Sequence, residues 1–172
     1  NTLNISRGFK ALVPSDVVKY HTGLNPYLVI SETPRTRYFR FASKPNKTFH
    51  VSCPHVIYKL SKRGLSIFLH FDDEITINTK LYKPPFSNGN NPVCVGSNPR
   101  PGFDEIDKLY KWIKEFYWES PFSHDYSSDM VNQKIQKKFK SQIEYFDFLN
   151  KNNLSIKEEH LRFHGTFKDL IL

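Results

Sequence analysis

A cysteine lies in a segment rich in proline, asparagine and glycine, "LYKPPFSNGNNPVCVGSNPRPG", which covers residues 81–102. Such a segment favours an irregular loop, because proline removes backbone donors and glycine adopts conformations that other residues avoid. A thiol on a shaped loop is open to other molecules, as a nucleophilic cysteine must be. Lys83 and Arg100 add positive charge that favours a thiolate. The segment therefore predicts a nucleophile, for which Cys94 is the candidate.

No histidine lies close to Cys94 in the sequence to act as its general base. An enzyme that receives its acyl group as a thioester or adenylate needs no such base, because that group is already activated. It does need a donor beside the developing oxyanion, and Asn88, six residues before the thiol, is a candidate. A second interpretation stays open, in which residues 93–95 form a short buried strand and the asparagines only form turns.

The elements that must position this loop begin with strands. Residues 26–30, 35–42, 55–60 and 65–71 are β-branched and aromatic runs of strand length. The turn signal Lys62-Arg63-Gly64 separates the last two runs and predicts a hairpin. These runs therefore predict antiparallel neighbours joined by short turns.

Helical spacing begins after the loop. The apolar residues from Ile106 to Phe116 predict one helix, and residues 131–146 predict a second, with Ser127-Ser128-Asp129 as its N-cap. Residues 156–163 predict a last short helix, or else the tail covers a sheet edge. Residues 14–20 allow two helical turns at most. Strands followed by helices predict an α+β fold, an antiparallel meander with helices on one face, and the length predicts one domain, residues 1–172.

The composition limits the possible partners and cofactors. The formal net charge of +8 suits a partner with an acidic face, but the basic clusters at Arg35–Arg40 and Lys134–Lys140 are interpreted as solvated surface. No apolar run is long enough to span a bilayer and no signal core is present, which predicts a soluble, cytoplasmic protein. The cysteines have no zinc-ligand spacing, and no metal or cofactor is predicted. Cys53, Trp112 and Trp118 are assigned to the core.

Four segments, in this order, resemble one family. "CPHVIYKLSKRGLSIFLHF" resembles its proline-led β-hairpin, "LYKPPFSN" its tyrosine, proline and asparagine segment, "VCVGS" its cysteine strand and "FYWESPFSH" its histidine segment. The chain is thereby identified as similar to the bacterial E2-like proteins of the ubiquitin-conjugating superfamily. Within these it resembles prokaryotic E2 family D and the B protein of the PRTRC system, as in Bil conjugation cassettes.

The resemblance implies a UBC-like fold, an antiparallel four-stranded meander sheet flanked by helices. It implies that Cys94 accepts the C-terminus of a ubiquitin-like protein as a thioester and that Asn88 stabilises the oxyanion. His124 would orient or deprotonate the attacking amine. The implied partners are a ubiquitin-like protein, an E1-like ThiF adenylating enzyme, a JAB-type peptidase of the same cassette and a target protein. Antiphage defence is the implied biological setting.

The sequence also departs from the usual E2 pattern. "KPPFSN" stands in place of the usual His-Pro-Asn triplet, and the spacing from asparagine to cysteine is shorter than in most E2 enzymes. Two alternatives therefore accompany the enzyme hypothesis. One is a non-catalytic E2-like adaptor that binds the ubiquitin-like protein or the E1. The other is a nucleic-acid-binding module, motivated by the net charge and by arginines interleaved with aromatic residues in "RTRYFRF".

Overall fold

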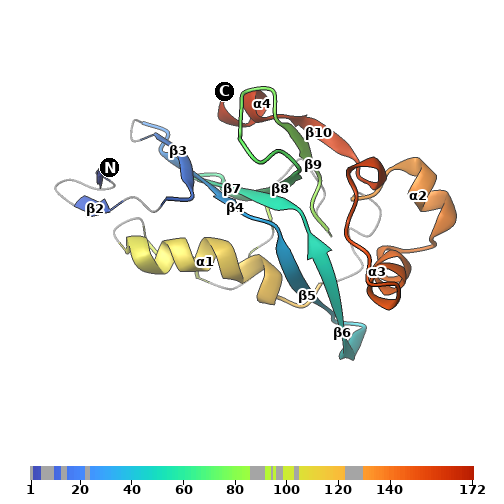
Figure 1. The fold of residues 1–172 in the computed structure, drawn as a ribbon. Coiled ribbons are helices and arrows are strands. Elements are labelled where there is room, and N and C mark those ends of the chain that lie inside the picture. Colours follow the sequence, from blue (N-terminus) through green and yellow to red (C-terminus); the bar gives the residue numbers. More distant parts are fainter. Residues whose placement is uncertain are drawn as a thin grey trace.

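The computed structural model describes residues 2–4, 10–12, 15–21, 24–85, 92–93, 95, 99–102, 105–122 and 130–172 (Figure 1). Its strands are β1 (Thr2–Asn4), β2 (Lys10–Leu12), β3 (Val17–His21), β4 (Tyr27–Glu32), β5 (Arg35–Phe41), β6 (Lys44–Cys53), β7 (His55–Ser61), β8 (Gly64–His70), β9 (Lys80–Tyr82) and β10 (Phe163–Thr166). Its helices are α1 (Ile106–Glu119), α2 (Gln133–Lys138), α3 (Gln142–Lys151) and α4 (Phe167–Ile171), with a 3-10 turn at Glu158–His160. The predicted α+β class is confirmed.

The main sheet has six strands in the order β10-β9-β8-β7-β4-β3, and every neighbouring pair is antiparallel. The four predicted runs become β4, β5, β7 and β8. The main sheet therefore has more strands than the four-stranded sheet that the resemblance implies. β3 adds a strand at one edge, where the sequence allowed two helical turns, and β9 with β10 extends the other edge.

A long bent hairpin joins the sheet to a separate two-stranded ribbon. The register that pairs Glu32 with Val56 continues without a shift into the pairing of Arg35 with Cys53. In that register Pro34 lies opposite Pro54. Because proline has no N–H to donate to a ladder, the two prolines interrupt the pairing at one level. β4 and β5 thus act as one bent strand against β6 and β7, and the β5–β6 end leaves the sheet (Figure 1).

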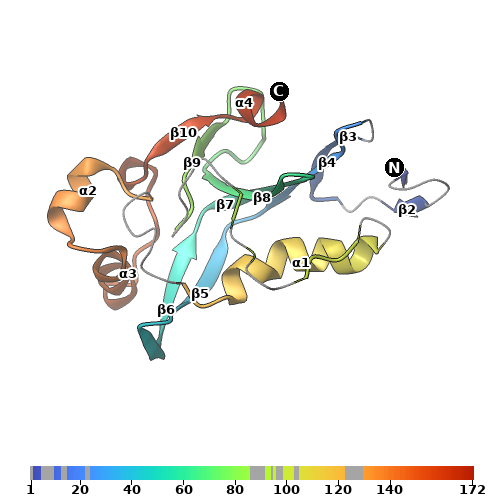
Figure 2. The same cartoon turned by 180° about the vertical axis from the view of Figure 1, so that it is seen from behind.

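The two faces of the sheet carry different apolar clusters. One face, with Leu28, Tyr58 and Leu60, packs in the main core with Leu109 and Ile113 of α1. The other face, including Val29, Ile57, Phe68 and Leu81, packs against Phe167 at the start of α4. α1 and α4 accordingly lie on opposite sides of the sheet when it is seen from front and back (Figures 1 and 2). The predicted first helix is confirmed, whereas the prediction that helices cover one face only is wrong.

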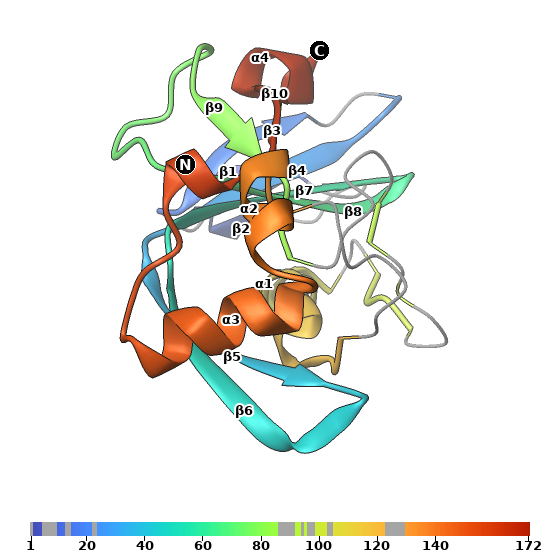
Figure 3. The ribbon, with the colours of Figure 1, turned by 90° about the vertical axis from the view of Figure 1, so that its right-hand side faces the viewer.

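The predicted second helix is broken in two. Phe139, immediately after α2, has an extended backbone, and Ser141 caps the start of α3 by accepting a hydrogen bond from the Glu144 backbone N–H at 3.2 Å. The Glu144 carboxylate in turn accepts from the Lys140 N–H at 2.8 Å. The sequence Ser-x-x-Glu is a helix-start signal, and here it competes with the continuous apolar spacing and prevails. α3 then packs beside β6 of the ribbon (Figure 3).

The N-cap predicted for the second helix, Ser127 to Asp129, lies outside the described residues. Asn132 caps α2 in the structure, since its side chain accepts from the Ile135 N–H at 3.2 Å. The tail forms β10 and α4 after the 3-10 turn, which confirms the edge-covering alternative for the C-terminal residues. None of the described helices combines the length and the apolar character that a membrane span requires.

His70 is a buried histidine at the end of β8. Its Nε2 lies 3.2 Å from the Ser31 hydroxyl, and its ring stacks on His55 with centroids 4.8 Å apart. Its Nδ1 has no hydrogen-bond partner among the described residues. Burial, and then the nearby His55, lower the pKa of His70 to about 4, and the ring is therefore neutral at neutral pH.

We expect His70 to make the protein less stable in mild acid. In the unfolded chain this histidine is protonated with the ordinary pKa of 6.5, whereas in the native protein its pKa is about 4. The stability contributed by neutral His70 is thus complete above pH 6.5 and is lost as the pH falls through this window. Chemical denaturation at several pH values should give His70→Gln a shallower decline than the wild type. Equal declines would contradict the assignment.

Candidate functional site

The three residues proposed for chemistry, Cys94, Asn88 and His124, all lie outside the described residues. The structure does describe the chain on both sides of them. The cysteine segment is described up to Pro85 and again at residues 92, 93 and 95. The histidine segment is described up to Phe122 and again from Met130. The site can therefore be built from its anchors.

The entry to the cysteine segment is held by α1. β9 leads into Lys83, Pro84 and Pro85, which are buried. The hydroxyl of Tyr117, on α1, donates a hydrogen bond to the Pro85 carbonyl. Burial raises the pKa of Tyr117 well above its usual value, and nearby Tyr58 and Cys53 add to the shift, which keeps the hydroxyl protonated as a donor. The chain is thus fixed three residues before Asn88.

The part of the cysteine segment just before Cys94 is held at the β7–β8 turn. The Val93 N–H donates to the Leu65 carbonyl at 2.7 Å, and the Val93 side chain packs against the main core. Gly64 in this turn has a φ of +125°, and a Cβ placed there would lie 2.8 Å from the Pro92 Cβ. Only glycine adopts this positive φ without strain and also leaves room for the Pro92 side chain. The residue immediately before Cys94 is therefore placed against the end of the sheet.

The histidine segment starts from the β5–β6 ribbon. Phe122 donates through its N–H to the Arg40 carbonyl and accepts from the Ala42 N–H, both at 2.9 Å. Its ring contacts Tyr117 with centroids 5.2 Å apart. Tyr117 therefore touches the start of both segments, because its hydroxyl holds Pro85 and its ring holds Phe122.

The exit of the histidine segment is tied to the entry of the cysteine segment. The Arg162 N–H donates to the Met130 carbonyl at 2.8 Å, and the Arg162 carbonyl accepts from the Lys83 N–H at 3.1 Å. One residue of the C-terminal tail thus bridges two segments that are far apart in sequence. The fold brings together the ends of the segments that contain Asn88, Cys94 and His124, through Tyr117 on one side and Arg162 on the other.

The comparison with family models gives a match to prokaryotic E2 family D over residues 11–159. That span includes all three proposed site residues and most of the chain. The chain belongs to prokaryotic E2 family D. A search of curated proteins and a search of solved structures each found no match. Family D membership makes this an E2-like protein of the conjugating-enzyme kind, which confirms the resemblance drawn from the sequence motifs.

A buried charge network in this family D chain was not predicted from the sequence. Glu32, at the end of β4, accepts hydrogen bonds from Arg37 at 2.7 Å and from the Tyr58 hydroxyl. The Tyr58 oxygen accepts in turn from Trp118 Nε1 at 2.6 Å, and the Arg37 guanidinium lies 4.1 Å from the Trp118 ring centroid. Lys114 of α1 adds a charge at 3.6 Å from Glu32. The network joins the bent hairpin to α1.

The electrostatics of Glu32 follow from this network. Burial alone raises the pKa of the carboxyl, but the hydrogen bonds from Tyr58 and Arg37, together with the charges of Arg37 and Arg35, more than offset it and hold the pKa below its usual value. Glu32 is therefore ionised at neutral pH. Arg37 Nε and Nη1 have no hydrogen-bond partner among the described residues. The guanidinium thus depends on Glu32 and on the Trp118 ring for compensation.

This network corrects the interpretation of the basic run Arg35–Arg40 at one position, because Arg35 and Arg40 are exposed as predicted but Arg37 is not. Arg37 is buried, with 3% of its surface exposed, and is not part of a solvated face. Arg40 donates to the Glu119 carbonyl at 2.8 Å. Phe39 and Phe41 alternate into the core, which leaves Tyr38 as the exposed ring of the run. The pattern that motivated the nucleic-acid alternative is instead a strand that packs against α1.

Cys53 is a structural residue, as the sequence predicted. Its side chain is buried and unpaired, and burial raises the pKa of the thiol to about 12 despite the nearby arginines. Trp118 is buried in the core, and Trp112 is partly buried against it. Cys53 therefore cannot supply a thiolate at neutral pH, which leaves Cys94 as the chain's candidate nucleophile.

Proposed function

We propose that this family D protein is an E2-type transferase that carries a ubiquitin-like protein as a thioester on Cys94 and passes it to an amine of a target protein. The observation that carries the proposal is the family match, which spans the cysteine segment. The shared anchors of the two segments add support, because a defined geometry around a reacting thiol needs fixed loop ends.

The first step is an exchange of thioesters. The Cys94 thiolate attacks the thioester carbonyl that joins the ubiquitin-like protein to its E1, and a tetrahedral oxyanion forms. The C–S bond to the E1 then breaks and the E1 cysteine leaves as a thiolate. Neither bond change needs a general base, since both the nucleophile and the leaving group are thiolates. The Asn88 side-chain amide is the proposed donor to the oxyanion.

The second step forms the amide. The amine of the target attacks the thioester carbonyl on Cys94, the amine loses a proton, and the Cys94 thiolate leaves. His124 is the proposed group that orients the amine and takes its proton. The roles of Asn88 and His124 come from the E2 resemblance of "LYKPPFSN" and "FYWESPFSH".

The same resemblance supports the proposed partners. They are a ubiquitin-like protein as cargo, an E1-like ThiF adenylating enzyme as donor and a target protein as acceptor. A JAB-type peptidase from the same cassette would remove the modification. We propose antiphage defence as the setting in which the conjugation acts.

The test is a reconstitution. The protein is incubated with a ThiF-like E1 and a ubiquitin-like protein, with and without ATP. The expected result is an adduct that depends on ATP and disappears in a reducing gel. Binding of the ubiquitin-like protein or the E1 without any adduct would instead make the protein a non-catalytic adaptor.

Tyr117→Phe is expected to slow the chemistry while leaving partner binding unchanged. The phenyl ring keeps its contact with Phe122, but the Pro85 carbonyl loses its donor and the cysteine segment loses an anchor. A small displacement of a reacting group is costly, and we expect thioester formation to slow by about tenfold to a hundredfold. The measurement is single-turnover kinetics beside the Kd for the ubiquitin-like protein.

Tyr110→Phe is the matched control for Tyr117→Phe. It removes a hydroxyl from the same helix, one that donates to Asp16 rather than to the cysteine segment. We expect it to leave thioester formation at the wild-type rate. If both variants slowed the reaction equally, Tyr117 would act only through the stability of α1.

A further inference from the structure

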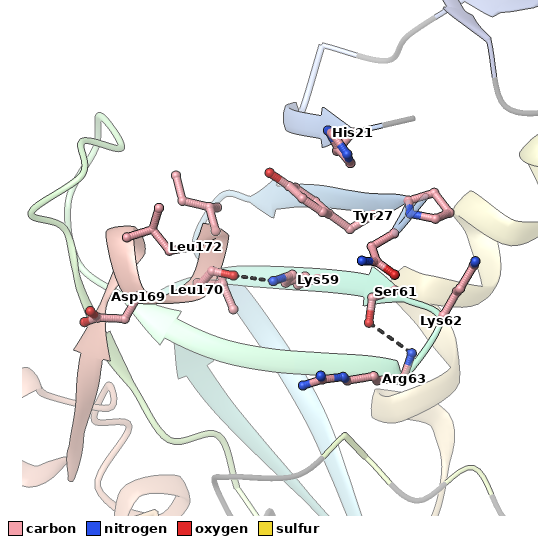
Figure 4. Close-up of a pocket in the computed structure, with 12 residues that line it drawn as sticks. His21, Tyr27, Lys59, Ser61, Lys62, Arg63, Asp169, Leu170 and Leu172 are labelled. Atoms are coloured by element: carbon pink, nitrogen blue, oxygen red, sulfur yellow. Dashed lines mark hydrogen bonds between the residues drawn. The ribbon is translucent and has the colours of Figure 1, made fainter. Parts of the chain in front are cut away.

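A pocket of about 630 Å³ lies on the α4 side of the sheet. It is enclosed by the end of β3, the turn into β4, the β7–β8 turn and α4 (Figure 4). His21, Tyr27, Lys59, Lys62, Arg63 and Leu170 are among its lining residues. The β7–β8 turn that borders it also anchors Val93, but Val93 packs against the main core on the other side of the sheet.

The pocket has a surplus of positive charge. Lys59, Lys62 and Arg63 line it, and the one acidic side chain among its lining residues is that of Asp169. The Asp169 carboxylate already accepts from the Thr166 N–H at 2.7 Å and from its hydroxyl at 2.8 Å. Three cationic side chains thus face one acidic side chain, which leaves the pocket side chains with a net positive charge.

The individual cations are only partly satisfied. The Lys59 amino group donates to the Leu170 carbonyl, and the Lys62 amino group donates to the Leu24 carbonyl at 2.8 Å. The Arg63 guanidinium has no partner in the part of the chain that the structure describes. Burial lowers the pKa of Lys59, and repulsion from Arg63 adds to the effect. An anion bound between these two side chains would relieve that repulsion.

β3 supplies a second recognition element beside the pocket. It is an edge strand of the six-stranded sheet, and within the described residues no strand pairs with its outer side. Lys19 and His21 pair with Val29 and Tyr27, which places their side chains on the pocket face. An extended peptide added to such an edge forms main-chain hydrogen bonds and directs every second side chain to the same face.

The aromatic residues of the pocket argue against nucleic acid. Base stacking needs a free ring face. His21 stacks on Tyr27 with centroids 5.6 Å apart, and the Lys59 amino group lies 5.0 Å from the Tyr27 centroid. The Tyr27 ring is thus engaged by its own neighbours, whereas the strand edge and the apolar side chains of α4 suit a polypeptide.

We propose that the pocket and the β3 edge together bind an extended acidic segment of a partner protein, which adds to the sheet beside β3 and places carboxylates among Lys59, Lys62 and Arg63. This docking does not rest on thiol chemistry at Cys94. It holds whether the protein is a transferase or an adaptor.

The test uses the full chain and a synthetic peptide in which glutamate alternates with valine. Binding is measured by fluorescence anisotropy at about 50 mM salt, where surface charge interactions are strong. NMR should show shifts of the β3 amides. The double variant Lys62→Glu/Arg63→Glu should weaken binding on the order of tenfold, because each reversal replaces attraction with repulsion. The matched control Lys134→Glu/Lys137→Glu changes the net charge equally but lies on α2, and it should bind like the wild type.

Two further probes separate the alternatives. The same peptide with N-methylated backbone amides along one edge cannot pair as a strand and should bind more weakly. A single-stranded thymidine oligonucleotide should not compete for the pocket. No peptide binding, equal losses in both double variants, or unchanged affinity of the methylated peptide would each overturn the proposal. Tighter binding of the oligonucleotide that is lost in Lys62→Glu/Arg63→Glu would assign the pocket to nucleic acid instead.

Discussion

Cys94→Ala is expected to abolish the ATP-dependent adduct with the ubiquitin-like protein, and Cys94→Ser is expected to convert it into an adduct that survives reductant. Alanine has no nucleophile. A serine hydroxyl is a much weaker nucleophile than a thiolate, but its ester with the carboxyl terminus is not cleaved by a thiol reductant. Non-reducing and reducing gels, with intact mass spectrometry, distinguish the thioester from the ester.

Cys53→Ser is the matched control, because it changes the chain's other cysteine. The Cys53 thiol is buried and its pKa is raised to about 12, and it should contribute nothing to the adduct. The control is expected to keep the reducible adduct while lowering stability, since it places a hydroxyl in an apolar site. An adduct retained in Cys94→Ala and lost in Cys53→Ser would falsify the assignment of the nucleophile.

The predicted strands were those with a strong local signal. The residues of β4, β7 and β8 are rich in β-branched and aromatic side chains, because these strands are covered on both faces. β6 was not predicted, since its start is the polar sequence "KPNK". Its pairing is instead specified by β5, with which it shares a register carried over from β4 and β7. Tertiary pairing thus overrides a weak local preference.

The candidate site was predicted at the level of motifs and not of geometry. The order of the segments around Cys94 and His124 is enough to indicate the family, and the family model matches the same part of the chain. Nothing in the local sequence indicates that Tyr117 reaches Pro85 or that Arg162 joins Lys83 to Met130, because these contacts join residues far apart in the chain. The apolar spacing ended at Phe116 and gave Tyr117 no predicted role. Its hydroxyl becomes an anchor only because the segment that follows β9 places the Pro85 carbonyl beside it.

Removing one partner of the buried Glu32–Arg37 pair is expected to be strongly destabilising. Glu32→Leu leaves the Arg37 guanidinium buried beside Trp118 with no carboxylate, and it also removes the acceptor of the Tyr58 hydroxyl. A buried charge without compensation costs about 3–5 kcal/mol. Urea denaturation should show this loss in the free energy of unfolding. Glu105→Ala, which removes an exposed ion pair with Lys108, should leave the free energy of unfolding close to that of the wild type.

The double variant Glu32→Leu/Arg37→Met decides what the pair does. If the pair were a net source of stability, the double variant would be less stable than the wild type. Desolvation opposes the attraction between two buried charges, and apolar replacements of similar size often restore what a single substitution loses. We therefore expect the double variant to be more stable than either single variant.

Full recovery of stability would mean that the pair is not needed for folding. Its remaining effect would be to fix the angle between the bent hairpin and α1, and hence where Tyr117 meets the cysteine segment. A recovered double variant that forms the thioester as slowly as Tyr117→Phe would identify that positional effect, whereas wild-type rates would exclude it.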